Sequence, residues 1–283
     1  MKDFNGKIAV ITGGASGIGR AMAELFLERG MNVVLGDIEQ SALDAAVEAL
    51  GADRCLGVVT DVSKAEDVQA LADAAVERFG AIHIACNNAG VFAGGLLWEE
   101  SVADYEWQMN VNVWGVIHGI RTFVPIMAEQ GDECHVVNTA SMAAVTAMPY
   151  SGIYHMTKHA VLALSESLYH ELSIHTPNVK VSVLCPEAIN TGIADSARNR
   201  PADLSGEGKD EQTAESEMVV GALAATTAAG LSPMVMAERV FDAINEERFY
   251  ILSEEGWRQA AHIRCDDIRE GRNPTLSADV VMG

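Results

Sequence analysis

Tyr154 and Lys158 stand four residues apart, a spacing that places two side chains one above the other on the same face of a helix. A phenol releases its proton at about pH 10, so Tyr154 alone would be a poor base. A neighbouring ammonium group favours the phenolate and lowers the pKa of the phenol, which makes a usable general acid or base. Ordinary amphipathic helices carry the same pair as a surface contact, so its meaning depends on the elements that position it.

The first of these elements is a strand followed by a glycine-rich turn. The β-branched run Lys7 to Thr12 predicts a buried strand, and the pattern that continues to Arg29 predicts an amphipathic helix. A strand, a glycine turn and a helix aim backbone N–H groups and a helix N-terminus at a phosphate, although glycines also make plain turns. The spacing between the two elements is Gly-x3-Gly-x-Gly. The loop residues that we expect at a bound phosphate are Gly13, Ser16, Gly17, Ile18 and Gly19.

Asp37 stands at the end of the second predicted strand, 32–36, eighteen residues after Gly19. A carboxylate at this position accepts hydrogen bonds from the ribose hydroxyls of NAD and repels the 2′-phosphate of NADP. No basic residue stands beside it to attract that phosphate, because its neighbours in sequence or in the turn are Ala15, Ser16 and Ile38. The sequence therefore predicts NAD as the cofactor. The alternative is that Asp37 caps the helix predicted at 39–50.

Strands and helices continue to alternate along the chain. Further strands are predicted at 55–60, 82–86, 134–139, 179–184 and 249–252. Helices are predicted near 64–79, 102–127, 154–174, 237–246 and 254–271. Repeated βα units predict an α/β fold with a doubly wound parallel sheet. Ligands of such sheets lie at the carboxyl ends of the strands, where this chain places Gly13, Asp37, Asp61, Asn87 to Gly90, Ser141 and Pro186.

Composition limits the other possibilities. The 283 residues are enough for one large domain, 1–283, and 49% of them are hydrophobic. The net charge of −21, with six lysines, argues against a nucleic acid or an anionic membrane as partner. We expect no membrane span and no signal peptide. The five scattered cysteines lack metal-ligand spacing, so we expect no metal and a reducing cytoplasm.

Five motifs in order give the chain a family resemblance. They are Thr12 to Gly19, Asn87 to Gly90, Asn112 in Asn-x-x-Gly, Ser141, and the Tyr154–Lys158 pair. Together they resemble the short-chain dehydrogenase/reductase family over roughly residues 5–190, and a complete set is highly specific. The resemblance implies a Rossmann-type single domain that binds NAD and oxidises an alcohol or reduces a ketone. It also implies a homodimer or homotetramer built on the long helices.

The resemblance assigns a role to each motif residue. Tyr154 would exchange a proton with the substrate oxygen, and Lys158 would lower the pKa of Tyr154 and hold the nicotinamide ribose. Ser141 would hydrogen-bond the reacting oxygen, and Asn112 would hold a water that links Lys158 to solvent. The remaining cofactor contacts implied are Ile38, Asp61, Val62, Asn88, Ile189 and Thr191. A non-catalytic NAD-sensing module is the competing class, and it would have no reason to keep all four catalytic residues.

The segment 191–236 is longer than a minimal member of the family needs, and we expect it to form a substrate lid. A helix-strand-helix extension, 237–283, follows it. Methionines 218, 234 and 236, with Val145 and Met148, suggest an apolar pocket for a bulky hydrophobic alcohol or ketone, or are simply core. The segments 1–4, 189–193, 199–201 and 248–251 are similar to Cα-dehydrogenases of lignin-derived aryl ethers. The runner-up substrates are hydroxysteroids and 3-hydroxyacyl compounds.

Three residues depart from the family pattern. Glu187 stands where the family usually has glycine, and its carboxylate would either bind a polar substrate group or point to solvent. If it binds substrate, Glu187→Gly should change substrate preference more than NAD affinity. His155 and His159 lie inside the catalytic helix, where we expect packing or interface residues rather than a second base.

Overall fold

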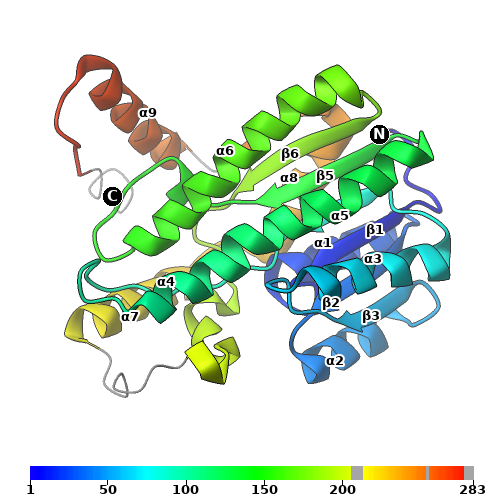
Figure 1. The fold of residues 1–283 in the computed structure, drawn as a ribbon, viewed down its shortest axis with the longest axis horizontal. Coiled ribbons are helices and arrows are strands. Elements are labelled where there is room, and N and C mark those ends of the chain that lie inside the picture. The colour runs from blue at the N-terminus through cyan, green and yellow to red at the C-terminus, as the bar shows by residue number, and fades with distance from the viewer. Residues whose placement is uncertain (205–212, 253–254, 277–283) are drawn as a thin grey trace.

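The computed structural model describes residues 1–204, 213–252 and 255–276. Over these residues the chain forms one parallel sheet of seven strands in the order β3-β2-β1-β4-β5-β6-β7 (Figure 1). The order reverses between β1 and β4, and such a switch point opens a crevice at the carboxyl ends of the strands. The strands are β1 Ile8–Thr12, β2 Asn32–Asp37, β3 Cys55–Val59, β4 Ile84–Asn87, β5 Cys134–Thr139, β6 Val179–Cys185 and β7 Tyr250–Leu252.

Helices cover both faces of the sheet, as the βα alternation predicts. One apolar cluster joins the sheet to α1, α2 and α8, and a second joins it to α3, α5 and α6. The α-helices are α1 Gly17–Glu28, α2 Gln40–Leu50, α3 Ala65–Phe79, α4 Val102–Met109, α5 Gly115–Gln130, α6 Gly152–His175, α7 Ala214–Ala228, α8 Pro233–Glu246 and α9 Glu255–Glu270. Short 3-10 turns are η2 Met142–Ala144, η3 Gly192–Asn199 and η4 Ala202–Leu204.

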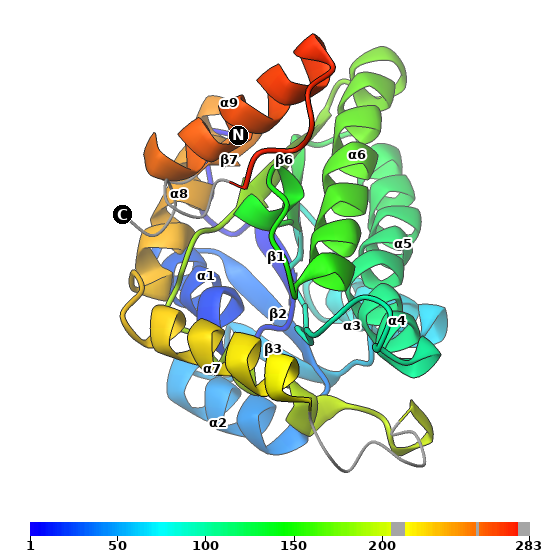
Figure 2. The ribbon, with the colours of Figure 1, turned by 90° about the vertical axis from the view of Figure 1, so that its left-hand side faces the viewer.

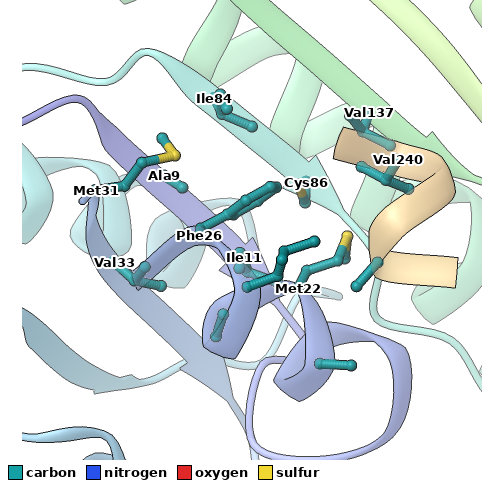
Figure 3. Packing of buried hydrophobic residues seen from close by; sticks show 14 of the residues in the cluster. Ala9, Ile11, Met22, Phe26, Met31, Val33, Ile84, Cys86, Val137 and Val240 are labelled. Atoms are coloured by element: carbon teal, nitrogen blue, oxygen red, sulfur yellow. The ribbon is translucent and has the colours of Figure 1, made fainter. Parts of the chain in front are cut away.

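The central strand β1 is buried along its whole length and serves both faces. Ala9 and Ile11 point toward α1 and α8, whereas Val10 between them belongs to the opposite cluster. Figure 3 shows Phe26 of α1 lying across β1, with Met22 beside it. Such burial on both faces explains why the strand reads as a continuous apolar run, and it anchors the glycine turn that follows Thr12.

The helical stretch from 102 to 130 is continuous but changes its winding. Between α4 and α5, residues Asn110–Trp114 form a π-helical turn, η1. By length and composition the stretch Val102–Gln130 is a candidate membrane span, a test that the core helix of a globular protein also passes. Part of its apolar surface packs against the sheet, where Phe123 and Met127 of α5 are fully buried.

The expected lid region contains η3, η4 and α7, and residues 205–212 lie outside the described residues. Helix α7 starts at a cap in which Thr213 accepts a hydrogen bond from Ser216 N–H. Figure 2 shows α7 on the same side of the molecule as the crevice end of the sheet, and α9 close to β7 and α6. Both helices therefore lie where they can border a site.

Candidate active site

A cavity of about 780 Å³ lies along the carboxyl ends of the strands. It extends from the glycine turn at one end to Ser141, Tyr154 and Lys158 at the other. Of the predicted site residues, Gly19 and Asn112 do not line it. Those that do are Gly13, Ser16, Gly17, Ile18, Asp37, Ile38, Asp61, Val62, Asn88, Ser141, Tyr154, Lys158, Ile189 and Thr191. Residues from distant parts of the sequence thus meet in one space large enough for a cofactor and a substrate.

Tyr154 and Lys158 lie on the first turns of α6, where Lys158 is buried and Tyr154 is partly exposed. The Nζ atom of Lys158 is 5.5 Å from the centre of the Tyr154 ring, and the edge of Phe92 packs on that ring at 5.2 Å. Burial lowers the pKa of Lys158 to about 8. Burial also raises the pKa of Tyr154 to about 12, and a hydrogen bond with Ser141 opposes this shift only in part.

Burial therefore dominates the pKa of Tyr154, and the expected lowering of this pKa by Lys158 stays a prediction. Loss of solvation is the largest cause of this shift, because burial disfavours the charged phenolate. Lys158 itself donates to the Thr139 carbonyl at 3.0 Å, which leaves two of its three N–H donors for other partners. The absence of a side chain at Gly90 keeps this ammonium accessible, since a Cβ there would lie 3.4 Å from Nζ.

Ser141 lies in extended backbone immediately after β5 and caps the 3-10 turn η2. Its Oγ accepts a hydrogen bond from Ala143 N–H at 3.1 Å. A hydroxyl that accepts from the backbone still has its own hydrogen to donate. The geometry therefore orients the Ser141 hydroxyl as a donor beside the Tyr154 phenol.

Asn112 explains the π-helical turn. Its Oδ1 accepts from Val91 N–H at 2.8 Å, and its Nδ2 donates to the Val91 carbonyl at 3.0 Å and to Thr157 Oγ1 at 3.1 Å. The amide thereby ties the segment after β4 to α6, next to Lys158. A π turn inserted in an α-helix often marks such a site, and it accounts for an asparagine in the middle of a helix.

The glycine turn is held by side chains of β1 and β4. Thr12 Oγ1 accepts from the N–H groups of Asn88 and Ala89 at 2.9 and 3.1 Å. The Asn88 amide donates to the carbonyls of Thr12 and Gly13 at 3.0 and 3.3 Å. Gly19 completes the packing, because a Cβ there would be 2.1 Å from the Gly13 carbonyl oxygen. Asn88 and Gly19 thus shape the turn, and of the two only Asn88 also lines the cavity.

The start of α1 is open to an anion. Its N-cap residue, Ser16, makes no side-chain capping bond, and no acidic residue occupies the first turn. Gly13 and Gly17 have φ values of +62° and +52°, which favour glycine and let the backbone approach a ligand closely. Free N–H groups at a helix N-terminus are suited to binding a phosphate.

Asp37 is fixed at the edge of this turn. Its two carboxylate oxygens accept from Ala15 N–H at 3.0 Å and from Glu39 N–H at 3.1 Å. The alternative that it caps the next helix is wrong, since α2 starts at Gln40 and its N-cap is Glu39. The carboxylate lines the cavity and is placed to meet the hydroxyls of a bound ribose.

Asp61 and Val62 lie farther along the same wall. The Asp61 carboxylate accepts from Ser63 N–H and Oγ and pairs with Lys64 at 3.3 Å, so its charge is already balanced. Val62 is buried, whereas the apolar Ile38 is 42% exposed and faces the cavity. Such apolar surface is suited to the flat face of an aromatic base.

The two histidines of α6 have structural partners. His155 Nδ1 lies 3.0 Å from the carbonyl oxygens of both Ala143 and Thr146, so it carries the hydrogen and donates to them. This contact holds the η2 turn, which carries Ser141, against α6. His159 Nδ1 lies 2.8 Å from the carbonyl of His155. Burial lowers the pKa of both rings, which favours their neutral forms and agrees with a packing role.

Glu187 also has a protein partner. Its side chain is only 8% exposed and accepts from Arg239 Nη1 of α8 at 3.1 Å, so the expectation that it points to solvent is wrong. It lines the cavity near Pro186. The ion pair supplies a fixed carboxylate where the family pattern has no side chain.

The apolar walls of the cavity come mostly from residues that sequence reasoning did not single out. They include Phe92, Trp107, Met142, Val219, Leu223 and Trp257. Of the methionines expected there, Met218 is exposed, Met236 is in the core and Met234 packs against the core, while Met148 does line the cavity. Helices α7 and α9 contribute Leu223 and Trp257, whose role depends on how those helices dock and leaves no local sequence signal.

Together these features define a dinucleotide-type crevice that ends at Tyr154, Ser141 and the buried Lys158. The family model for short chain dehydrogenases matches residues 7–202. The chain is 46% identical to a solved short chain dehydrogenase/reductase from Burkholderia phymatum in complex with NAD, with a TM-score of 0.95 over 98% of this chain and 99% of that one.

Two curated relatives extend the comparison. A C alpha-dehydrogenase from a Sphingobium species is 33% identical over 89% of this chain and 82% of that protein. A 1-deoxy-11-beta-hydroxypentalenate dehydrogenase from Streptomyces exfoliatus is 34% identical over 93% of this chain and 88% of that protein. The chain therefore belongs to the short-chain dehydrogenase/reductase family, and it is an oxidoreductase with the single-domain Rossmann-type fold expected from its sequence.

Proposed function

We propose that the protein is an NAD-dependent dehydrogenase that converts a bulky hydrophobic secondary alcohol to a ketone, or catalyses the reverse reaction. One observation carries the proposal: a single cavity joins an open helix N-terminus and Asp37 to Tyr154, Ser141 and the buried Lys158. The first group can hold a dinucleotide, and the second can exchange a proton with an alcohol.

The cofactor end suits NAD. The N-terminus of α1 and the glycine turn would bind the pyrophosphate, and Asp37 would accept hydrogen bonds from the adenosine ribose. Ile38 and Val62 would contact the adenine, with Thr191 and Ile189 near the nicotinamide and Lys158 at its ribose. When bound, the nicotinamide supplies the hydride chemistry. The solved relative from Burkholderia phymatum, which is in complex with NAD, supports this assignment.

Tyr154 would take the proton of the alcohol hydroxyl during oxidation and return it during reduction. Ser141, oriented by Ala143 N–H, would donate a hydrogen bond to the same oxygen and stabilise its developing negative charge. Lys158, with a pKa of about 8, stays largely cationic at neutral pH and would favour the phenolate. The positive charge of an oxidised nicotinamide close by would act in the same direction.

Asn112 would serve this proton exchange by position. Its side-chain amide donates both hydrogens to protein groups and fixes α6 beside Lys158. The relay water that the family resemblance implies at Asn112 therefore remains a proposal, and the amide hydrogens are not available to hold it. The clamp supports a site that is organised before substrate arrives.

The substrate would be large and apolar. Trp257, Met142 and Leu223 line the cavity, and Arg198, a cation among the described residues of its wall, is already paired with Glu39. An aryl or benzylic alcohol is one candidate, which the C alpha-dehydrogenase relative supports, and the pentalenate dehydrogenase supports a bulky polycyclic alcohol equally well. Hydroxysteroids and 3-hydroxyacyl compounds are the alternative class.

The assembly and the cellular location are also proposals. Trp114, Met156 and Tyr169 expose 46, 43 and 42% of their surface along the long helices, which supports a homodimer or homotetramer through that face. The abundance of unpaired, mostly buried cysteines supports a reducing cytoplasm.

The test is a matrix of two cofactors and four classes of alcohol. The purified protein is incubated with NAD or NADP and with aryl, terpenoid, steroid or 3-hydroxyacyl alcohols, while the absorbance of the reduced cofactor is followed. We expect reduction of NAD with a bulky secondary alcohol. Activity with NADP alone would refute the argument from Asp37, and a strong preference for acyl compounds would select the alternative substrate class.

A further inference from the structure

The ribose end of the cavity contains a cation that the sequence around Asp37 does not reveal. Among the described residues that line the cavity, Lys158 and Arg198 are the lysine and arginine side chains. Lys158 belongs to the Tyr154 end. Arg198 is the last but one residue of η3, and it reaches the same wall as Asp37 and Glu39 from a segment about 160 residues away in sequence.

Arg198 is held close to the glycine turn. Its Nη1 donates to the carbonyls of Gly192 and Asp195 at 3.3 and 2.8 Å, so the guanidinium lies against its own turn. Thr191, which stands just before η3, lies against the glycine turn, because a Cβ at Gly17 would be 3.0 Å from Thr191 Cγ2. A guanidinium fork anchored here is within the neighbourhood of the ribose and phosphate groups that the turn would bind.

Glu39 is the carboxylate nearest to this cation, and the exposed Asp195 carboxylate lies farther away, at 3.8 Å from Arg198 Nη1. Glu39 Oε1 accepts from Arg198 Nε at 3.1 Å, from Arg198 Nη2 at 2.8 Å and from Asn199 Nδ2 at 2.8 Å. The hydrogen bonds from Asn199 and Arg198 lower the pKa of the Glu39 carboxyl, so it remains ionised at neutral pH. The guanidinium is thereby turned toward the β2–α2 connection, and its charge is cancelled at the place where a 2′-phosphate would need it.

We propose that Glu39 is a second cofactor-specificity residue, which acts by keeping Arg198 from pairing with a 2′-phosphate. The inference rests on the proposed use of NAD. Asp37 repels the phosphate directly, whereas Glu39 withholds the side chain best suited to bind it. The two effects are distinct, so loss of both carboxylates should convert the preference with no new cation introduced.

A simpler role for the pair would be to tether the lid segment to the sheet. In that case Glu39→Gln would weaken NAD and NADP by the same factor, because both cofactors lie beneath the same segment. The specificity role requires the opposite: NADP must gain relative to NAD, and the gain must depend on Arg198. Cofactor binding to the full-length protein, measured by titration calorimetry without any alcohol, separates the two.

The variants are Asp37→Asn, Asp37→Asn with Glu39→Gln, and the same double variant with Arg198→Met. Asp37→Asn should shift the ratio of the two dissociation constants toward NADP by about tenfold, and adding Glu39→Gln should shift it about tenfold further, the size of one charge-assisted hydrogen bond. Arg198→Met should abolish that second gain. Glu246→Gln, which removes one carboxylate from a surface pair with Arg248, is the matched control and should leave the ratio unchanged.

The proposal is overturned if the double variant binds NADP no better than Asp37→Asn, or if its gain survives Arg198→Met. If adding Glu39→Gln to Asp37→Asn weakens the binding of NAD and NADP by the same factor, the pair of Glu39 and Arg198 serves as a tether instead. If the unmodified protein itself binds neither dinucleotide, or prefers NADP, the proposed function fails first. If the unmodified protein binds NAD but the double variant gains no affinity for NADP, only the proposed role of Glu39 fails.

Discussion

Lys158→Met removes one buried charge and keeps most of the side-chain volume, so it isolates the electrostatic role of the lysine. The Nζ atom lies 5.5 Å from the centre of the Tyr154 ring. Two unit charges at that separation interact by about 3 kcal/mol when the effective dielectric constant is about 20, which corresponds to about 2 pKa units. Without Lys158, the phenol of the cofactor complex should therefore release its proton about 2 pH units higher.

The assay is the pH dependence of kcat/KM for alcohol oxidation with saturating NAD. Oxidation needs the phenolate, so activity rises with pH through the pKa of Tyr154, and a higher pKa moves this rise to higher pH. At a fixed pH below the midpoint, the loss should be about 100-fold, and it should diminish toward alkaline pH. Lys158→Arg keeps the charge and serves as the control: its midpoint should stay near that of the unmodified enzyme, whatever its rate.

A different pattern would refute this reasoning. If Lys158→Met lowers kcat/KM by the same factor at every pH and leaves the midpoint in place, the lysine acts only by holding the cofactor. Calorimetric titration with NAD would then show a matching loss of affinity. A midpoint that moves while the NAD affinity is kept supports the electrostatic role.

Three further predictions concern other parts of the molecule. Burial lowers the pKa of His135 to about 3, below its value in the unfolded chain, so protonation favours the unfolded chain. Between about pH 6.5 and 5 the free energy of unfolding should therefore fall by about 2 kcal/mol. In His135→Gln, the urea midpoint should depend less on pH across this range. Gly19→Ala should weaken NAD binding at least about tenfold in calorimetry because its Cβ meets the Gly13 carbonyl, whereas Gly221→Ala, with open space around it, should not. Trp257→Ala should lower kcat/KM about tenfold or more for bulky aryl alcohols and much less for a small one such as 2-butanol, and equal losses would remove Trp257 from the substrate wall.

The order of strands and helices along the chain could be predicted because the residues of each βα unit alone indicate its structure. Strands such as Ile8–Thr12 are continuous apolar runs buried on both faces, and the turns between units contain glycine or polar residues. The predicted bounds of α3 and α6 lie within a few residues of the observed ones for the same reason. The residues Ser141, Tyr154 and Lys158 follow local motifs, so their meeting in one cavity could be expected from the parallel topology.

The remaining features depend on how distant segments dock. Arg198 pairs with Glu39 across most of the chain, and Trp257 reaches the cavity only because α9 packs beside β7 and α6. The hydrogen-bond partners of side chains could not be predicted either. One example is His155, whose ring contacts the carbonyls of Ala143 and Thr146. The raised pKa of Tyr154 follows from burial, which no spacing of residues reveals.

In the proposed reaction, Tyr154 exchanges the proton while NAD takes the hydride. It is tested most directly by following NADH formation from NAD and the best alcohol of the panel with the unmodified protein and with Tyr154→Phe. We expect the variant to lose about 10²- to 10⁴-fold in kcat/KM and still to fold and bind NAD. Full activity in Tyr154→Phe would contradict it.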